Sequence, residues 1–482
     1  MCLSSRYAEW RRRSGVVVCL QDKPDPPPER LLQAIWFHQR LLRDQLQTTD
    51  GRKLQVLHPG FWNRERGPDF RGAVLRFGEA EPCSGDVEID LHSHDWHGHK
   101  HEANPDFQRV ILHVVWAAQE TPERPTLTLP GVLDSPLAEL GVWVGSEGAE
   151  LFPLDLLGHC CAPLRQLTSV RTRELLHEAA LVRLQAKASL FQARARQAGW
   201  EQALWEGLFR ALGYKQNLWP MQRLGELRAR IGAAPEPLSV LQLQARLLGI
   251  ANLLPEDLTR RKRGADVYLR RLWDCWWRVR EELVEYQLPR TLWNLSGQRP
   301  ANHPQRRLAL AAHWLLDGQI LSRVDEWGTA PLAPGAAAAA LLEALQVAED
   351  TFWSRHWTLR SPRLERARPM LGAPRATDLA MNVLLPWLWM RAVQGQNAAL
   401  QASLETRYLG WPTAEDNALL RLARQRLLAT RAGGPALRGA AAQQGLLQIV
   451  KDFCENSNSL CAECRFPELV RQWPQAVRDA EG

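Results

Sequence analysis

The stretch GDVEIDLHSHDWHGHKHEANPDFQRVILHVVW, residues 85–116, decides the class of fold that this sequence can adopt. Its two ends, GDVEIDLH and RVILHVVW, are short runs rich in β-branched residues, which are typical of β-strands. We expect a short helix between them, at HEANPDFQ. The stretch therefore predicts two strands of one sheet that are joined through a helix.

The residues on the N-terminal side supply the rest of this sheet. KLQVLHPG (53–60) and GAVLRFG (72–78) are further apolar runs bounded by glycine or proline, as strands are. A helix is expected from Glu29, because apolar residues recur at helical spacing after the proline-rich PDPPPER. The order helix, three strands, helix, strand predicts an α/β domain with a mixed sheet over residues 29–162.

From residue 163 onward the hydrophobic period becomes that of helices. Long segments such as RTRELLHEAALVRLQAKASLFQARARQAG are rich in Leu, Ala, Arg and Glu. They predict a large all-α region, made of one or more domains, over residues 163–440. A C-terminal helix and a cysteine cluster are expected at 441–482, and residues 1–28 are interpreted as a flexible tail.

The composition is that of a globular protein. A length of 482 residues suggests two or three domains of about 150 residues each. The net charge of +7 favours an acidic partner such as nucleic acid. No apolar run reaches the roughly 18 residues of a membrane span, so we expect no membrane association. Nine cysteines, an odd number, favour thiols or a metal site over disulfides and indicate a cytoplasmic protein.

Several motifs together resemble one bacterial family. They are HPGFWNRERGPDF, GDVEIDL, DWHGHKH, VILHVVW, RPANHPQRRLA and MNVLLPW, with the cysteine-rich C-terminus. The family is catalogued as domain of unknown function 2851, and the resemblance covers nearly the whole chain after residue 28. It implies no activity.

The N-terminal domain also resembles the PD-(D/E)xK nuclease fold, which is the restriction-endonuclease-like fold. In that fold an acid on the second strand and an acid on the third strand face one cleft. Pro68-Asp69 and the later Glu88-Ile89-Asp90 match this order. Alternation along a strand places Glu88 and Asp90 on one face. The resemblance implies a Mg²⁺ or Mn²⁺ site with Asp69 and Glu88 as ligands.

Three further residues complete this candidate catalytic site. Nucleases of this fold carry a lysine at the position of Asp90, and Lys100 is our candidate for the displaced ammonium group. Glu29, at the start of the first helix, is a candidate outer ligand. In the alternative interpretation, Asp69 caps a turn and Glu88 pairs with a nearby arginine.

Histidines surround the same segment. His99 and His101 are candidate ligands of a metal or a phosphate, and the family resemblance favours them over His97. His113 lies in an apolar strand, where we expect a hydrogen-bonded core histidine. Because of these histidines, a metal-dependent hydrolase other than a nuclease is an alternative function.

Basic residues are concentrated between residues 255 and 310, where they could contact phosphates. The run RRKR and the proline-broken turn RPANHPQRRLA supply the candidate nucleic-acid contacts: Arg261, Lys262, Arg263, Arg299, Asn302 and Arg307. Most of the nearby tryptophans are interpreted as core residues.

A cysteine motif lies close to the C-terminus. FCENSNSLCAECRF contains Cys454, Cys461 and Cys464, a spacing typical of metal sites. A fourth thiolate could come from Cys160 or Cys161. Four thiolates suit either Zn²⁺ or a [4Fe-4S] cluster, and the alternative is a group of free buried thiols.

Two hypotheses about function follow. The first is a metal-dependent nuclease-like phosphodiesterase whose helical region grips DNA or RNA. The second is a catalytically degenerate nucleic-acid-binding or scaffold protein, which the absence of lysine at position 90 favours.

Overall fold

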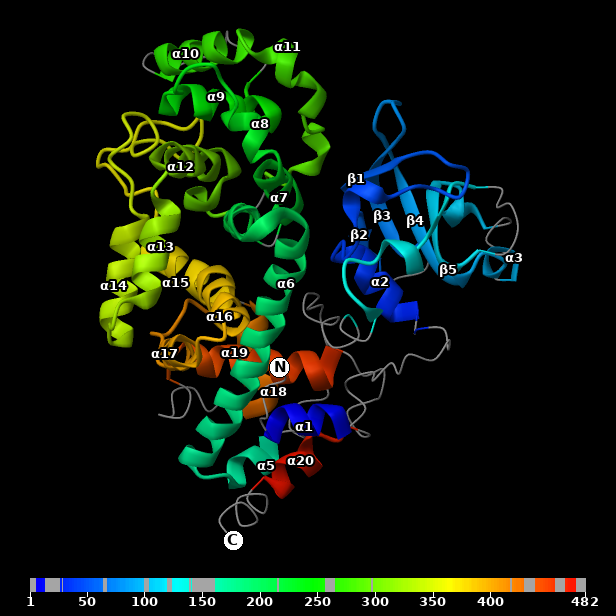
Figure 1. Ribbon diagram of the computed structural model, residues 1–482, viewed down its shortest axis with the longest axis vertical. Coiled ribbons are helices and arrows are strands. Elements are labelled where there is room, and N and C mark those ends of the chain that lie inside the picture. Colours follow the sequence, from blue (N-terminus) through cyan, green and yellow to red (C-terminus); the bar gives the residue numbers. More distant parts are fainter. Residues whose placement is uncertain are drawn as a thin grey trace. The chain divides into compact units, whose positions relative to one another are not determined.

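In the computed structural model, the chain folds into two compact units (Figure 1). Unit 1 comprises Met1–Arg171, Leu422–Thr430 and Leu447–Gly482, and unit 2 comprises Thr172–Arg421 and Arg431–Leu446. Within them the structure describes residues 6–13, 27, 29–63, 67–98, 104–118, 124–137, 140, 161–214, 216–255, 265–295, 298–416, 418–428, 438–455 and 464–473.

The N-terminal part of the chain forms a mixed sheet of six strands. The strands are β1 (Leu54–His58), β2 (Phe61–Trp62), β3 (Phe70–Phe77), β4 (Cys83–His92), β5 (Val110–Ala117) and β6 (Thr126–Thr128). Their order is β1-β3-β4-β5-β6, and β2 pairs with β3. The pairs β1/β3 and β3/β4 are antiparallel, whereas β4/β5 and β5/β6 are parallel. This confirms the mixed sheet predicted from the strand patterns.

A crossover segment joins β4 to β5, as parallel neighbours require. It contains helix α3 (Asp95–Gly98) and the 3₁₀ turn η3 (Pro105–Phe107). The side chain of Asn104 caps η3 by accepting a hydrogen bond from the backbone N–H of Asp106. The turn lies inside HEANPDFQ, where a short helix was expected, while α3 begins earlier than that segment.

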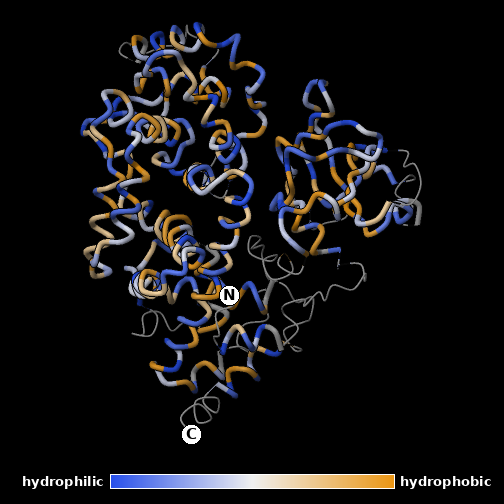
Figure 2. Tube along the Cα trace, viewed as in Figure 1, coloured by the Kyte–Doolittle hydropathy of each residue, from blue (hydrophilic) through white to orange (hydrophobic). Residues whose placement is uncertain are grey.

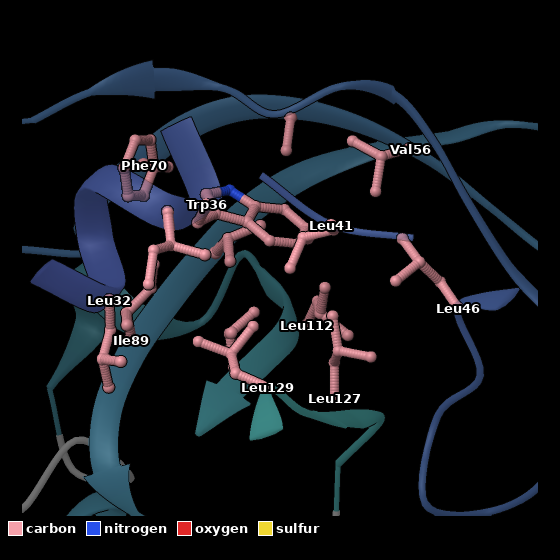
Figure 3. Close-up of a cluster of buried hydrophobic side chains, with 14 of the residues drawn as sticks. Leu32, Trp36, Leu41, Leu46, Val56, Phe70, Ile89, Leu112, Leu127 and Leu129 are labelled. Atoms are coloured by element: carbon pink, nitrogen blue, oxygen red, sulfur yellow. The ribbon is translucent and has the colours of Figure 1, made fainter. Parts of the chain in front are cut away.

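Helix α2 (Glu29–Phe37) lies against the sheet and closes its main core (Figure 1). Figure 3 shows Trp36 of α2 among Leu112 and Leu41, with Ile89 of β4 beside Leu32. Trp36 is fully buried, and its indole N–H donates to the carbonyl of Pro59 over 2.9 Å.

Strand β4 turns one face to this core. Its odd-numbered side chains, Val87, Ile89 and Leu91, pack in or against the core. Because side chains alternate along a strand, the even-numbered ones face the other side of the sheet.

Helix α1 (Arg6–Arg13) lies inside the stretch interpreted as a flexible tail, so that interpretation is wrong for these residues. Tyr7 is fully buried, and its hydroxyl donates to Asp452 over 2.9 Å. The Nε atom of Arg11 lies 2.8 Å from the same buried carboxylate. Trp10 packs edge-on against Trp473, with ring centroids 4.7 Å apart. The partners of α1 are more than 400 positions away in sequence, which is why local patterning did not reveal them.

After β6, the structure assigns helices and connecting loops, and no strand, to the residues that it describes, which confirms the predicted helical region. Hydrophobic residues recur along these helices at intervals (Figure 2). Among the helices that the structure describes, none is both long and apolar enough to cross a membrane. The helices are α5 (Cys161–Gln166), α6 (Ser169–Leu212), α7 (Leu218–Glu226), α8 (Arg228–Gly232), α9 (Val240–Ile250), α10 (Ala265–Trp277), α11 (Arg280–Leu283), α12 (Pro304–Asp317), α13 (Ile320–Thr329), α14 (Pro334–Leu345), α15 (Ala373–Leu379), α16 (Leu385–Gln394), α17 (Ala398–Leu409), α18 (Ala418–Leu428), α19 (Ala440–Val450) and α20 (Phe466–Gln472).

Candidate functional site

Two carboxylates that the sequence singled out meet where β3 begins beside β4. Asp69 directly precedes β3, whose first residue, Phe70, pairs with Val87 of β4. The backbone N–H of Asp69 donates to Oε2 of Glu88 over 2.9 Å. In return, the backbone N–H of Ile89 donates to Oδ2 of Asp69 over 3.1 Å. These reciprocal hydrogen bonds hold both carboxylates at one place on the sheet.

Asp90 lies on the same face of β4 as Glu88 and has a histidine partner. Its Oδ2 atom is 2.9 Å from Nε2 of His113 on β5, and both side chains are buried. His113 is therefore a hydrogen-bonded core histidine, as expected. The parallel register aligns His113 with Glu88, so the histidine belongs to the carboxylate cluster. Sequence reasoning did not assign His113 this place, because the alignment of β4 with β5 is a tertiary feature.

Helix α2 contributes a polar residue that sequence reasoning missed. The amide of Gln33 donates to Oδ1 of Asp69 over 2.9 Å and to Oε1 of Glu29 over 3.0 Å. Gln33 therefore connects Glu29, the predicted outer ligand, to the centre of the cluster. The spacing of four residues between Glu29 and Gln33 on one helix face is the sequence signal that could have identified it.

The cluster is electrostatically unfavourable without a counter-charge. Burial, together with the charge of Glu29, raises the pKa of Asp69 from 3.8 to about 7. Burial and the neighbouring Asp69 raise the pKa of Glu88 from 4.5 to about 9. Hydrogen bonds from backbone N–H groups offset only part of these shifts. At neutral pH the cluster therefore retains protons that a bound cation would displace.

This arrangement has the chemistry of a hard-cation site. Each oxygen of Asp69 accepts one hydrogen bond from the chain, and a carboxylate oxygen has a second lone pair to offer. Mg²⁺ is held in proteins by one or two carboxylates and retains several waters. Asp69 and Glu88 fit that ligand set. A cation held there would lower the pKa of a bound water and stabilise charge on a phosphodiester.

Several predicted site residues lie outside the described part of the chain. These are Lys100, His99, His101, Arg261, Lys262, Arg263, Cys160 and Cys461. Cys161 lies in α5 and Cys454 in the π-helical turn η11 (Lys451–Glu455), but their side chains are also outside what the structure describes. The Sγ atom of Cys464 is 4.0 Å from the carbonyl oxygen of Phe453.

The turn RPANHPQRRLA holds the predicted nucleic-acid contacts of unit 2 that the structure describes. Arg299 is exposed, with an ion pair of 3.1 Å to Glu415. Arg307 is buried; it donates to the carbonyl of Met370 over 2.9 Å and to Oδ1 of Asn302 over 2.7 Å. A buried guanidinium that serves the chain's own acceptors does not reach a phosphate. We therefore correct the prediction for Arg307 and assign it to the packing of unit 2.

These features define an α/β protein with a buried carboxylate cluster on a mixed sheet, linked to a large helical region. The chain belongs to the family described as Protein of unknown function (DUF2851), whose sequence model matches residues 29–417. No curated protein and no solved structure matches it.

Proposed function

We propose that the protein is a metal-dependent nuclease-like phosphodiesterase that acts on nucleic acid. The cluster of Asp69, Glu88 and Asp90 carries this proposal, because burial and mutual repulsion make it a place where a divalent cation would bind. The chain order of α2, the antiparallel strands β1 to β4, a crossover and the parallel strand β5 supports it, since this order is similar to that of the PD-(D/E)xK fold.

Each residue of the cluster has a place in the proposed chemistry. Asp69 and Glu88 would hold Mg²⁺ or Mn²⁺, and such an ion would supply water activation and neutralise charge on the phosphate. The hydrogen bond from His113 positions Asp90, and Gln33 orients Asp69. Lys100 retains the role of a cation that stabilises the phosphate. The proposal places this activity in the cytoplasm, where a [4Fe-4S] or Zn²⁺ site at the C-terminal cysteines would persist in a reducing environment.

The test is a calorimetric titration of Mn²⁺ into the wild type, Asp69→Ala and Asp44→Ala. Asp44 is an exposed acid in the 3₁₀ turn η1 (Arg43–Gln45), so its variant is the control for a change in overall charge. Loss of residues that only support a metal ligand weakens binding by about 10- to 100-fold. Loss of the ligand Asp69 is therefore expected to weaken Mn²⁺ binding by at least about 100-fold, whereas Asp44→Ala should bind like the wild type.

The same three proteins are then assayed with Mg²⁺ and Mn²⁺ on single- and double-stranded DNA and RNA. Cleavage by the wild type and by Asp44→Ala, but not by Asp69→Ala, is the expected result. Equal Mn²⁺ binding by all three proteins would show that Asp69 is not a ligand of a bound cation. Tight nucleic-acid binding without cleavage would favour the degenerate binding protein, and metal-dependent hydrolysis of other phosphoesters alone would favour a different hydrolase.

The proposed nucleic-acid partner has a candidate stacking residue on α10. Trp277 is 64% exposed, whereas its neighbour Trp276 is buried. The guanidinium carbon of Arg280 lies 5.0 Å from the ring centroid of Trp277, and Arg278 is also exposed. An exposed indole beside arginines suits a stacked base next to its phosphates.

We expect Trp277→Ala to weaken binding of a fluorescent single-stranded oligonucleotide by about 5- to 150-fold, which corresponds to about 1–3 kcal/mol for one stacked base. Val267→Ala is the matched control, because Val267 is an equally exposed apolar residue of the same helix. Fluorescence anisotropy at two salt concentrations measures both affinities. Equal losses in the two variants, or no loss in Trp277→Ala, would show that α10 does not stack on bases.

A further inference from the structure

A second group of ligand side chains lies where β4 ends and α3 begins. His92 is the last residue of β4, and Asp95 is the first residue of α3. His94 lies between them. One potential ligand atom of each residue lies within 4.8 Å of those of the other two. None of these residues is part of the carboxylate cluster.

The local backbone brings these side chains together. The backbone N–H of His92 donates to Oδ2 of Asp95 over 2.9 Å, which closes the turn from the strand into the helix. The rings of His92 and His94 are stacked, with centroids 5.1 Å apart and an angle of 28° between their planes. Both imidazoles therefore lie close to one carboxylate.

The separations between the ligand atoms suit a metal better than direct hydrogen bonds. Nδ1 of His92 lies 3.5 Å from Oδ2 of Asp95, and Nε2 of His94 lies 3.4 Å from Oδ1. Hydrogen bonds between such atoms are about 2.7–3.2 Å long. Tetrahedral ligands on bonds of about 2.1 Å are separated by about 3.4 Å, as at a zinc ion. The two observed separations, one to each oxygen of Asp95, are close to this value.

We propose that His92, His94 and Asp95 form a binding site for a zinc-class transition-metal ion. Two imidazoles and one carboxylate select such ions over Mg²⁺, which prefers an all-oxygen ligand set. Three protein ligands leave a fourth tetrahedral position for water. The His94 side chain is 59% exposed, so an ion can enter from solvent.

The strand geometry relates this site to the carboxylate cluster. Glu88, Asp90 and His92 alternate along β4, so all three lie on one face of the strand. Two residues of a strand span about 6.6 Å, which places the imidazole of His92 next in line after Asp90. The zinc-class ion would also fix the start of the crossover that leads to Lys100. The site does not depend on the proposed phosphodiesterase activity.

Cobalt(II) is the probe for this site, because tetrahedral Co²⁺ absorbs visible light and reports its ligands. The full-length wild type is titrated with Co²⁺ and then with competing Zn²⁺, alongside His92→Ala, His94→Ala and Asp106→Asn. Asp106 is an exposed acid of the same crossover and serves as the control. The difference spectrum between wild type and His92→Ala is expected to show nitrogen and oxygen ligation without sulfur charge transfer. This distinguishes Co²⁺ bound at this site from Co²⁺ bound by the cysteines.

Each histidine variant is expected to bind at this site at least about 100-fold more weakly than the wild type, since each loses a direct ligand. Asp106→Asn, Asp69→Ala and a triple variant His97→Ala, His99→Ala, His101→Ala should all retain binding. Circular dichroism and the melting temperature show whether each variant is folded. If the triple variant lacks the visible absorption of bound Co²⁺ and His92→Ala retains it, the proposed ligand set is wrong. Loss of Mn²⁺ binding in Asp69→Ala with Co²⁺ binding intact would show that the two sites are independent.

Discussion

Replacing Glu88 with glutamine is expected to make the cation-free protein more stable at alkaline pH and to abolish divalent-cation binding at the carboxylate cluster. Glutamine retains an oxygen that can accept the hydrogen bond from the N–H of Asp69. It removes the buried charge, whose pKa burial and Asp69 raise from 4.5 to about 9. The variant therefore separates the structural role of this side chain from its role as a ligand.

The sign of the pH effect follows from proton binding. Both Asp69 and Glu88 have a higher pKa in the folded protein than in the unfolded chain, so the folded protein holds more protons between about pH 4 and about pH 9. The stability that these groups contribute is complete below their unfolded pKa values. It is lost as the pH rises through about 7 and then about 9. Glu88→Gln removes the larger part of this loss.

Thermal unfolding without metal at pH 5.5 and pH 9 measures the effect. One pKa unit corresponds to about 1.4 kcal/mol, so at pH 9 we expect Glu88→Gln to exceed the wild type by at least about 1 kcal/mol, or about 2–4 °C. At pH 5.5 the two proteins should differ less. Mn²⁺ should raise the melting temperature of the wild type and leave that of Glu88→Gln unchanged. A variant less stable than the wild type at pH 9 would contradict the repulsion in this cluster.

Replacing Arg306 with methionine is expected to have the largest effect on the stability of unit 2. Arg306 is 1% exposed, and its Nη1 atom donates to the carbonyls of Trp353 and His356. Its Nη2 atom donates to the carbonyls of Arg368 and Pro369 over 3.0 Å each. These acceptors lie between α14 and α15, in a segment without a regular helix. The guanidinium supplies hydrogen bonds that a helix would otherwise provide.

Methionine fills similar space but leaves these carbonyls without their donor, which costs about 1–3 kcal/mol for each buried group left unpaired. We expect a loss of about 3–5 kcal/mol in the free energy of unfolding, as when one partner of a buried charged network is removed. Hydrogen exchange should accelerate first between residues 346 and 372. Arg299→Met is the control; its side chain is 73% exposed, so we expect a change of less than about 0.5 kcal/mol. If both variants unfold at the same denaturant concentration, Arg306 does not organise this segment.

Local patterns in the sequence predicted much of the fold. Short runs rich in β-branched residues, GDVEIDLH and RVILHVVW, predicted strands, and the change of period near residue 163 predicted the helical region. These features depend on residues near each other in the chain, whose faces are set by backbone periodicity.

Only the tertiary structure decided which distant groups meet. The register between β4 and β5 paired Asp90 with His113, and the packing of α2 placed Gln33 on Asp69. Packing also buried Arg307, although the basic run Arg306-Arg307 is of a kind that is usually exposed. The sequence by itself determined which segments form strands and which form helices, and which titratable residues are present. Burial and pairing depend on contacts across long stretches of chain, and those contacts turn ordinary carboxylates into a cluster with raised pKa values.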